Sequence, residues 1–478
     1  MTRASDDGFD GASPRVPRGA RELLLELDLR RGRLRQSVRE ALREAIQDGR
    51  LQAGTSLPAS RRLAVDLGVS RGVVSDVYDQ LASEGYLEIS ARSAPIVAHV
   101  VGVSPPRPET APPDWRFDFI GTTPDVSLFP RRAWARAIDR ALGTAPDVSL
   151  DYGDQRGQAV LRHALSAYLA RVRGVRIDPG RIVVTQGFTQ ALDLLCRVLA
   201  RRGRTIVAIE TPSFSEEWAT ARESRLRLVG CPVDAHGLVV DRLEELGADA
   251  VIVTPAHQFP TGAVLAPSRR TALVGWAGRH DGLIIEDDYD AEFRYDRLAI
   301  GAVQGLAPDR VAHIGTASKT LAPGCRLGWL SLPGDLVEDV RARKAAADSG
   351  SPAIDQLALA ELLSNGEYER HVTRVRHIYR GRRDRLIMAL SRAMPSLEVR
   401  GAAAGMHVLL ALDPGVDDLA VLAAAADRGI RVRALSPLHL EPSRERGLLL
   451  GYGRLVEERI DEAVDALAVV LRRVGLRT

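Results

Sequence analysis

The strongest constraint on the fold is a series of short apolar runs that alternate with longer stretches of helical periodicity. The runs are three to five residues long and rich in valine and isoleucine, as buried strands are. Such alternation predicts an α/β domain with a largely parallel sheet. Residues that follow parallel strands gather at one edge of the sheet, where ligands bind. The runs are 182–185, 205–209, 250–253, 283–285 and 311–314.

Lysine is almost absent from the chain, so each remaining lysine is informative. Of 65 basic residues, only Lys319 and Lys344 are lysine. Arginine can replace lysine as a surface charge, but its guanidinium stays protonated and cannot attack a carbonyl. Lys319 follows the run 311–314, and Asp287 follows the run 283–285. A lysine for a Schiff base and a strand-end aspartate for the pyridinium nitrogen are the minimum that pyridoxal 5'-phosphate (PLP) requires.

Further side chains are predicted to surround the same cofactor. The planar guanidinium of Arg326 suits the phosphate, as do N–H groups at the start of a helix. Tyr289 is expected to donate a hydrogen bond to the ring oxygen, and Phe214 to stack on the ring face. The remaining predicted phosphate donors are the hydroxyls of Thr316, Ser318 and Thr189 and the backbone N–H groups of Gly187 and Phe188.

A proline-rich segment divides the chain. Residues 101–115 hold five prolines and few apolar residues, which predicts a semi-rigid linker. We expect a disordered leader over 1–20, a small domain over 21–100 and a large domain over 116–478. Within the large domain, we expect a large subdomain at about 150–340 and a small subdomain from 116–149 plus 341–478.

Bulk properties limit the class of protein. No stretch approaches the roughly 18 consecutive apolar residues of a membrane span, so no membrane partner is expected. Three scattered cysteines predict reduced thiols in a cytoplasmic protein. No group of residues suggests a metal site.

The small N-terminal domain has the pattern of a winged helix-turn-helix. Helical periodicity over 34–46 is followed by two short helices around the Gly68 turn, with Ser60 and Ser70 as expected N-caps. The segments 85–89 and 94–100 are expected to form the two strands of a wing. Residues 15–71 contain thirteen arginines against seven acidic residues, a charge of about +6 that suits nucleic acid.

This domain closely resembles the winged-helix domain of the GntR superfamily. The matching blocks are Gly49-Arg50-Leu51, Leu57-Pro58-Ala59-Ser60-Arg61-Arg62-Leu63-Ala64, Gly68-Val69-Ser70-Arg71 and Tyr78 to Leu87. The resemblance implies binding of double-stranded DNA at two half-sites, with Ser60, Arg61, Ser70 and Arg71 as contact residues. The segment 91–95 lacks the Gly-Ser-Gly tip that the family's wing usually carries.

The whole chain resembles the MocR-type (GabR/PdxR-like) regulators, which join such a domain to a fold type I aminotransferase-like domain. Three blocks carry this resemblance, namely residues 254–262, 286–295 and 315–328. The resemblance implies Lys319 as the Schiff-base lysine and a head-to-tail homodimer. It implies that Tyr152 reaches the partner's cofactor phosphate and that Arg446 clamps a ligand carboxylate.

Two functions remain open at this point. The first is a transcriptional regulator whose effector is PLP itself, a small amine or an amino acid. The second is an active aminotransferase with an accessory DNA-binding module. The same motifs hold PLP in both cases, although the sequence His-Gln-Phe-Pro-Thr-Gly at 257–262 favours regulation. Glu216 occupies the position of a second arginine in GABA-sensing relatives, which disfavours GABA as effector. A scaffold without cofactor is disfavoured by the complete lysine, aspartate and arginine set.

Overall fold

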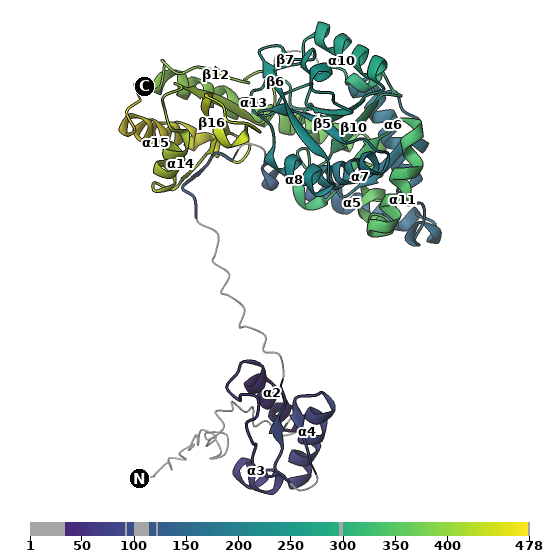
Figure 1. The fold of residues 1–478 in the computed structure, drawn as a ribbon, viewed down its shortest axis with the longest axis vertical. Helices are drawn as coiled ribbons and strands as arrows, with labels where there is room; N and C mark the ends of the chain where they lie inside the picture. The colour runs from purple at the N-terminus through teal and green to yellow at the C-terminus, as the bar shows by residue number, and fades with distance from the viewer. Residues whose placement is uncertain (1–33, 91–92, 100–113, 121–122, 296–299, 477–478) are drawn as a thin grey trace, which may run out of the picture. The chain divides into compact units, whose positions relative to one another are not determined.

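The structure is a computed structural model that describes residues 34–90, 93–99, 114–120, 123–295 and 300–476 (Figure 1). The chain separates into two compact units, Met1–Pro113 and Asp114–Thr478, each described by itself below. The predicted leader and residues 101–113 of the predicted linker lie outside the described ranges. Among the helices of those ranges, none has the length and apolarity needed to cross a bilayer.

The N-terminal unit is a helical domain with a short hairpin, as predicted. Its helices pack around one apolar core that includes Val38, Leu42, Leu63 and Leu81. The two strands pair antiparallel as the base of a wing, whose tip at 91–92 is not described. The elements are α2 (Leu34–Gln47), α3 (Ser60–Leu67), α4 (Arg71–Ser83), β1 (Leu87–Glu88) and β2 (Ile96–Val97).

Only one of the two predicted serine caps is present. The Ser70 hydroxyl accepts a hydrogen bond from the backbone N–H of Val73 at 3.4 Å and caps α4. The prediction for Ser60 is wrong, because α3 starts one residue earlier than the sequence pattern suggests. The carbonyl of Ala59 already accepts the N–H of Leu63 at 3.1 Å, so Ala59 is the N-cap residue and no side chain caps this helix.

This difference predicts unequal effects of two serine substitutions. Ser70→Ala should lower the free energy of unfolding of the N-terminal unit by about 1 kcal/mol, the usual cost of losing an N-cap. Ser60→Ala is the matched control and should change it by less than about 0.5 kcal/mol. Urea unfolding of both full-length variants, followed by circular dichroism, measures the difference. Equal losses would contradict the cap assignment.

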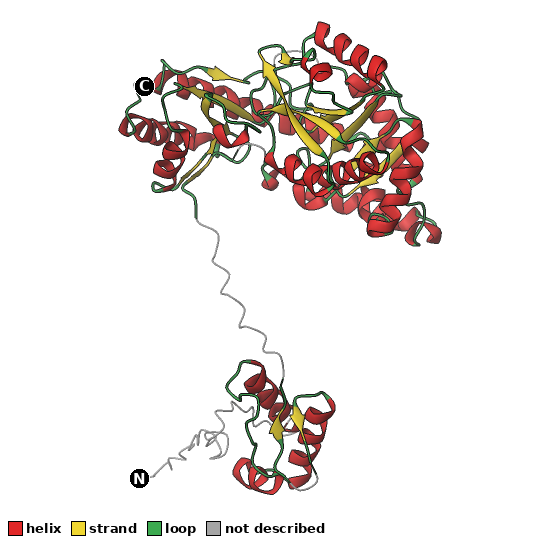
Figure 2. Cartoon of the chain, in the orientation of Figure 1, coloured by secondary structure: helices red, strands yellow, loops and turns green. Residues whose placement is uncertain are grey.

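An eight-stranded sheet forms the centre of the larger lobe of the C-terminal unit (Figure 2). Neighbouring strands follow the order β4-β11-β10-β9-β8-β5-β6-β7. From β10 to β6 the pairs are parallel, whereas β11 runs antiparallel to both β4 and β10. The five predicted strands are all present. The strands are β4 (Ile182–Thr185), β5 (Ile206–Thr211), β6 (Arg227–Asp234), β7 (Gly237–Leu238), β8 (Ala250–Val253), β9 (Leu283–Asp288), β10 (Val311–Thr316) and β11 (Gly328–Ser331).

Helices cover both faces of this sheet (Figure 1). The apolar residues of α7, α8 and α11 pack on one face, and those of α5, α6, α9, α10 and α12 pack on the other. The helices are α5 (Arg131–Thr144), α6 (Ala159–Arg173), α7 (Phe188–Arg201), α8 (Ser215–Glu223), α9 (Arg242–Glu245), α10 (Pro267–His280), α11 (Val337–Asp348) and α12 (Ala353–Ser364).

A smaller lobe contains a four-stranded antiparallel sheet in the order β12-β13-β16-β15. Three helices share its core, and Phe117 and Phe119 from the start of the unit pack into it. Its elements are β3 (Phe117–Asp118), which pairs with β14 (Ile430–Arg431), and α13 (Glu367–Ala393), β12 (Val399–Arg400), β13 (His407–Leu412), α14 (Asp418–Ala426), β15 (Arg433–Ala434), β16 (Arg446–Gly451) and α15 (Ile460–Arg473).

The division between the lobes differs from the predicted one. The sequence assigns 116–149 and 341–478 to a small subdomain. In the structure, α5, α11 and α12 pack in the core of the large sheet through Ala137, Val340 and Ala358. These helices therefore belong to the larger lobe by their packing, because that is where their apolar faces are buried.

Candidate functional site

A cavity of about 430 Å³ opens at the carboxyl ends of β9 and β10. Its wall is assembled from segments spread along most of the C-terminal unit, from Ile120 to Arg433. The lining residues are Ile120, Thr123, Phe188, Thr189, Phe214, Glu217, Thr220, Asp287, Tyr289, Thr316, Ser318, Lys319, Pro323, Arg326, Arg431 and Arg433.

Most residues predicted to bind the cofactor meet in this cavity. Nine of them line it, namely Lys319, Asp287, Tyr289, Phe214, Phe188, Thr189, Thr316, Ser318 and Arg326. Gly187 lies beside them, since a Cβ at this position would stand 3.6 Å from the Arg326 guanidinium. Its φ of +95° is a conformation that favours glycine.

Strand pairing explains why these residues converge. Asp287 near the end of β9 is opposite Ile314 of β10, and Lys319 follows β10 directly. The antiparallel strand β11 then returns beside β4 and brings Gly328 next to Thr185. The backbones approach so closely that a Cβ on Gly328 would lie 2.7 Å from the Cα of Gly187. The loop 317–327 is thereby fixed beside the N-terminus of α7.

Asp287 occupies a strongly perturbed environment. It is only 4% exposed, and its Oδ1 has no hydrogen-bond partner among the described residues. Burial raises the pKa of this carboxyl well above its usual value, the charges of Asp288 and Asp290 raise it further, and Lys319 opposes them. A cationic donor at Oδ1 would therefore stabilise the ionised form.

The neighbouring Asp288 is held by a buried ion pair. Arg173, which is 2% exposed, donates two hydrogen bonds to its carboxylate at 2.7 and 2.8 Å. His313 lies 3.0 Å from the same carboxylate. Burial would raise the pKa of Asp288, but the charge of Arg173 and the hydrogen bond with His313 outweigh it and hold the pKa far below its usual value. This network fixes the end of β9, where Asp287 stands.

Aromatic rings form another part of the wall. Phe214 stacks on Phe259 with ring centroids 3.6 Å apart, and its edge contact with Tyr289 measures 5.7 Å. Phe259 is buried, whereas Phe214 and Tyr289 line the cavity. Phe214 is therefore supported by a second ring, which leaves its other face available for a planar ligand.

Polar donors converge on the N-terminus of α7. This helix starts at Phe188 and has Gly187 as its N-cap residue, without a side-chain cap. The hydroxyl of Thr316 donates to that of Ser318 at 3.0 Å and holds the loop after β10 in place. Backbone N–H groups, hydroxyls and the Arg326 guanidinium around one point form an anion-binding arrangement.

Comparison with known proteins places the chain in a family. The family model "Aminotransferase class I and II" matches residues 124–467, and "Bacterial regulatory proteins, gntR family" matches residues 34–97. The chain is 32% identical to the HTH-type pyridoxine biosynthesis transcriptional regulator PdxR of Corynebacterium glutamicum, over 86% of this chain and 90% of that protein. It is 30% identical to the probable rhizopine catabolism regulatory protein MocR of Rhizobium meliloti, over 91% of this chain and 93% of that protein. The chain belongs to the MocR-type regulators of the GntR superfamily.

Solved structures agree with this assignment for the C-terminal unit. The crystal structure of an archaeal alanine:glyoxylate aminotransferase is similar with a TM-score of 0.70 and 30% identity, over 75% of this chain and 91% of that chain. The MocR-type chain therefore has the aminotransferase fold that its sequence predicts.

Two predicted site residues lie elsewhere in this MocR-type chain. Arg446 is not among the cavity-lining residues, and its Nη1 donates to the carbonyls of Ser443 and Glu445 at 2.7 and 2.8 Å. The spacing that suggests a clamp places this residue at the start of β16, where its own loop holds it. Tyr152 also lies outside the described cavity lining.

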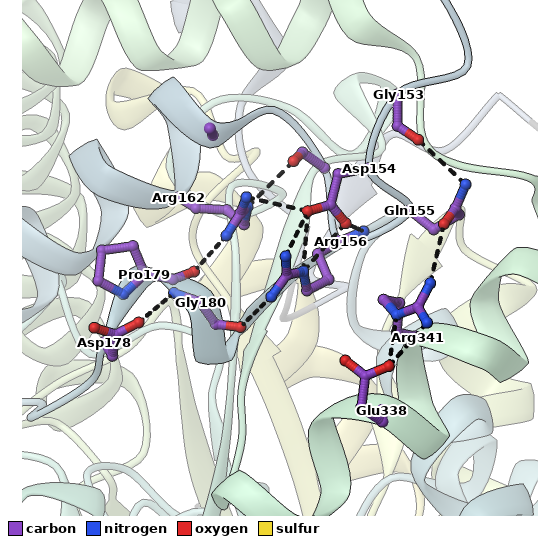
Figure 3. Close-up of polar contacts among 12 residues, drawn as sticks. Gly153, Asp154, Gln155, Arg156, Arg162, Asp178, Pro179, Gly180, Glu338 and Arg341 are labelled. Carbon is purple, nitrogen blue, oxygen red and sulfur yellow. Dashed lines mark hydrogen bonds and ion pairs between the residues drawn. The ribbon is translucent and has the colours of Figure 1, made fainter.

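Tyr152 is 81% exposed, in a segment whose following residues are firmly held. Asp154 binds Arg156 at 2.7 Å and Arg162 at 3.3 Å, and Arg162 also donates to the carbonyl of Pro179 at 2.8 Å (Figure 3). An exposed tyrosine on a rigid support is suited to a contact outside its own chain.

Five polar cavity residues are not among the predicted ones. They are Thr123, Glu217, Thr220, Arg431 and Arg433. A signal for the arginines exists, because Ile430-Arg431-Val432-Arg433-Ala434 alternates apolar and charged residues as a strand does. Glu217 and Thr220 lie on α8 without a distinctive motif, and the side chain of Glu216 lies outside the described part of the structure.

The candidate DNA-contact residues lie at the starts of two helices in the N-terminal unit. Arg61 and Arg71 are exposed in the first turns of α3 and α4. Ser60 is half-buried, and Ser70 is exposed. Both arginines thus present their charge at helix N-termini, which also favour anions.

Proposed function

We propose that this MocR-type chain is a transcriptional regulator that binds double-stranded DNA through its N-terminal unit and PLP through the cavity around Lys319. PLP itself or an amine that reacts with it is the effector. The observation that carries the proposal is the convergence of Lys319, Asp287 and Arg326 on one cavity in a chain with a gntR-family domain. These residues supply the amine, the carboxylate and the guanidinium that the aldehyde, ring nitrogen and phosphate of PLP require.

The described contacts of Asp287 support PLP as the ligand. Its buried Oδ1 has no partner among the described residues, and burial with nearby negative charge raises its pKa. A protonated ring nitrogen would donate to this oxygen and stabilise the carboxylate. When bound, PLP supplies an aldehyde that condenses with an amine and a ring that withdraws electrons. Lys319 is the amine of this chain that lines the cavity.

The phosphate is proposed to bind at the N-terminus of α7. The N–H groups of Gly187 and Phe188 and the hydroxyl of Thr189 would donate to it from one side. Thr316, Ser318 and Arg326 would donate from the loop after β10. Tyr289 would contact the ring oxygen and Phe214 the ring face, as the positions of both in the cavity wall allow.

DNA binding is expected to depend on Arg71. Arg71→Ala should weaken binding to operator DNA and reduce the slope of log affinity against log salt by about 1, as the loss of one phosphate contact does. Arg43→Ala is a suitable control, because Arg43 is paired with Glu84 at 2.5 Å. Fluorescence anisotropy at several salt concentrations measures both variants. An unchanged slope for Arg71→Ala would contradict a phosphate contact.

We further propose a homodimer, head-to-tail in arrangement, in which Tyr152 reaches the cofactor phosphate of the partner. Support comes from the exposure of Tyr152 together with Val148 and Leu150, which are 69% and 58% exposed. Large apolar side chains gathered on one exposed segment are typical of an interface. A twofold dimer also provides the two winged helices that two half-sites require.

The proposed effector site extends beyond the cofactor residues. Arg431, Arg433 and Glu217 also line the cavity wall. This mixture suits either the phosphate-bearing cofactor itself or an amine with an anionic group. An amine controls DNA binding only if it binds one arrangement of the dimer better than the other.

The second candidate function is an active aminotransferase with an accessory DNA-binding domain. The complete lysine, aspartate and arginine set is compatible with it, because the same residues would hold PLP in an enzyme. The decisive experiment incubates the PLP-loaded protein with amino acids and keto acids while DNA binding is followed in parallel. We expect an amine to change DNA affinity without sustained product formation. Continued turnover that leaves DNA affinity unchanged would overturn the regulator proposal.

A reducing cytoplasm is the proposed location of this regulator. Cys196 and Cys231 are buried free thiols, and Cys325 is a half-buried free thiol. Burial raises the pKa of the Cys196 thiol to about 12, which keeps it protonated and unreactive.

A further inference from the structure

Tyr289 contacts a buried polar cluster that has no part in the proposed function so far. His257 Nδ1 lies 3.0 Å from the Oδ2 of Asp290 and 3.1 Å from the hydroxyl oxygen of Tyr289. All three side chains are buried, with 2%, 2% and 5% exposure for His257, Asp290 and Tyr289. Tyr289 alone of the three also lines the cavity. The cluster therefore acts on the site through Tyr289.

Proton counting fixes the hydrogen bonds in this cluster. A bare Nδ1 would turn its lone pair toward a carboxylate oxygen at 3.0 Å, which would bring two acceptors together where both side chains are buried. A protonated Nδ1 instead donates to Asp290 and makes a hydrogen bond to a charged acceptor, the stronger kind. On this geometry we assign the proton of the contact to Nδ1 of His257.

The proton on Nδ1 of His257 determines which hydrogen bonds the Tyr289 hydroxyl can make. A protonated Nδ1 cannot accept a hydrogen bond from Tyr289. Burial and then the charge of Asp290 raise the pKa of Tyr289 well above its usual value, so the phenol keeps its own proton. Asp290 is also an acceptor for the phenol. Its Oδ2 already accepts from His257, which makes it a weaker acceptor for a second donor. A negatively charged ligand oxygen in the cavity therefore competes for the phenol proton.

We propose that Asp290 and His257 are positioning residues that keep the Tyr289 hydroxyl a hydrogen-bond donor toward an oxygen of the bound ligand. The proposal rests on the proposed function, under which that oxygen is the ring oxygen of PLP. A phenol fixed as a donor favours ligands with a negatively charged oxygen at this position.

The surrounding backbone is shaped to hold this cluster. Gly405 has a φ of +79°, and a Cβ there would lie 2.1 Å from Cε1 of His257 and 2.7 Å from Oδ2 of Asp290. The carbonyl of Gly405 accepts hydrogen bonds from Tyr295 and Tyr452, each at 2.7 Å. Two tyrosines thus anchor the glycine against the imidazole, so that His257 has little freedom to rotate.

The proton position is testable without any ligand. Nitrogen-15 NMR of the histidine-labelled full-length protein distinguishes a protonated from a bare Nδ1. The His257 signals are identified by their loss in His257→Gln. We expect Nδ1 to be protonated in the wild type. A bare Nδ1 would overturn the proposal, whether or not the protein binds PLP.

The link to the ligand is tested by a double-mutant cycle on PLP affinity. Tyr289→Phe should weaken binding about tenfold, the effect of one hydrogen bond. Asp290→Asn should weaken it by a similar factor, and the double variant should bind no more weakly than Tyr289→Phe. If Asp290→Asn has no effect, or weakens binding equally in both backgrounds, Asp290 does not act through Tyr289 and the inference fails. If the wild type binds no PLP, the proposed function fails first, and the NMR measurement still reports the proton on His257.

Discussion

Replacing Lys319 with alanine should abolish covalent attachment of PLP to this protein, because no other amine of the chain lines the described cavity. Borohydride treatment of the PLP-loaded wild type should fix the cofactor on the peptide that contains Lys319, as mass spectrometry would detect. The same treatment of Lys319→Ala should give no such mass increase. The substitution leaves the proposed DNA-contact arginines untouched, so operator binding without effector should persist.

Because the chain has only two lysines, the site of borohydride labelling can be assigned directly. Lys344 is the other lysine, and its amine is fully buried against Asp348 at 2.7 Å and Ser351 at 3.0 Å. It serves as an internal control that should stay unmodified. Lys319→Arg is the matched variant, since it keeps the charge but cannot condense with an aldehyde. Cofactor retained covalently by either variant would contradict the assignment of Lys319.

Asp288→Ala should lower the free energy of unfolding of the C-terminal unit by about 3–5 kcal/mol, the cost of leaving a buried charge without its partner. Arg173 is 2% exposed and loses both hydrogen bonds of its carboxylate fork in this variant. The loss should also loosen the end of β9 and weaken PLP binding at Asp287. Urea unfolding of the ligand-free protein measures the change in unfolding free energy separately from the change in PLP binding.

Two controls distinguish this ion pair from surface electrostatics. Asp309 pairs with Arg181, and the Asp309 side chain is 80% exposed. Asp309→Ala should therefore lower the free energy of unfolding by less than about 1 kcal/mol.

The second control is the dependence of stability on pH. The folded-state pKa of Asp288 is lowered, so its stabilisation is present above the unfolded pKa of about 4 and is lost as the pH falls. The wild type and Asp288→Ala should therefore become more alike in stability below about pH 4. If the difference in unfolding free energy between the wild type and Asp288→Ala stays constant with pH, the stabilisation does not come from the ion pair.

The contribution of His313 to stability depends on pH in the opposite direction. Burial lowers its pKa, but the hydrogen bond and charge of Asp288 raise it more, so the folded-state pKa is above the ordinary value. Its stabilisation is therefore present below an unfolded pKa of about 6.5 and lost as the pH rises through the folded value.

The fold of the large sheet could be predicted where strands are apolar and continuous. The runs at 182–185 and 250–253 coincide with β4 and β8. The antiparallel strand β11 was not among the predicted strands, because Gly328-Trp329-Leu330-Ser331 lacks the continuous valine and isoleucine of its neighbours. Its place between β4 and β10 depends on long-range pairing that local periodicity does not encode.

The site could be predicted where its residues follow strands, and less well where they come from the smaller lobe. Asp287 and Lys319 are marked by position and by chemistry. Arg431 and Arg433 reach the cavity only through the way the smaller lobe packs. Arg446 has the sequence spacing of a ligand clamp, but it does not line the cavity, and its Nη1 donates to carbonyls of its own loop. Residue spacing indicates which side chains share an element, whereas hydrogen bonding decides where each one points.

The assembly of the cavity from segments between Ile120 and Arg433 has a consequence for protein synthesis. A ribosome makes the winged helix first, and about nine tenths of the chain must be synthesised before the last wall residue, Arg433, is in place. A nascent or prematurely terminated chain would therefore possess its DNA-binding domain without a complete ligand cavity.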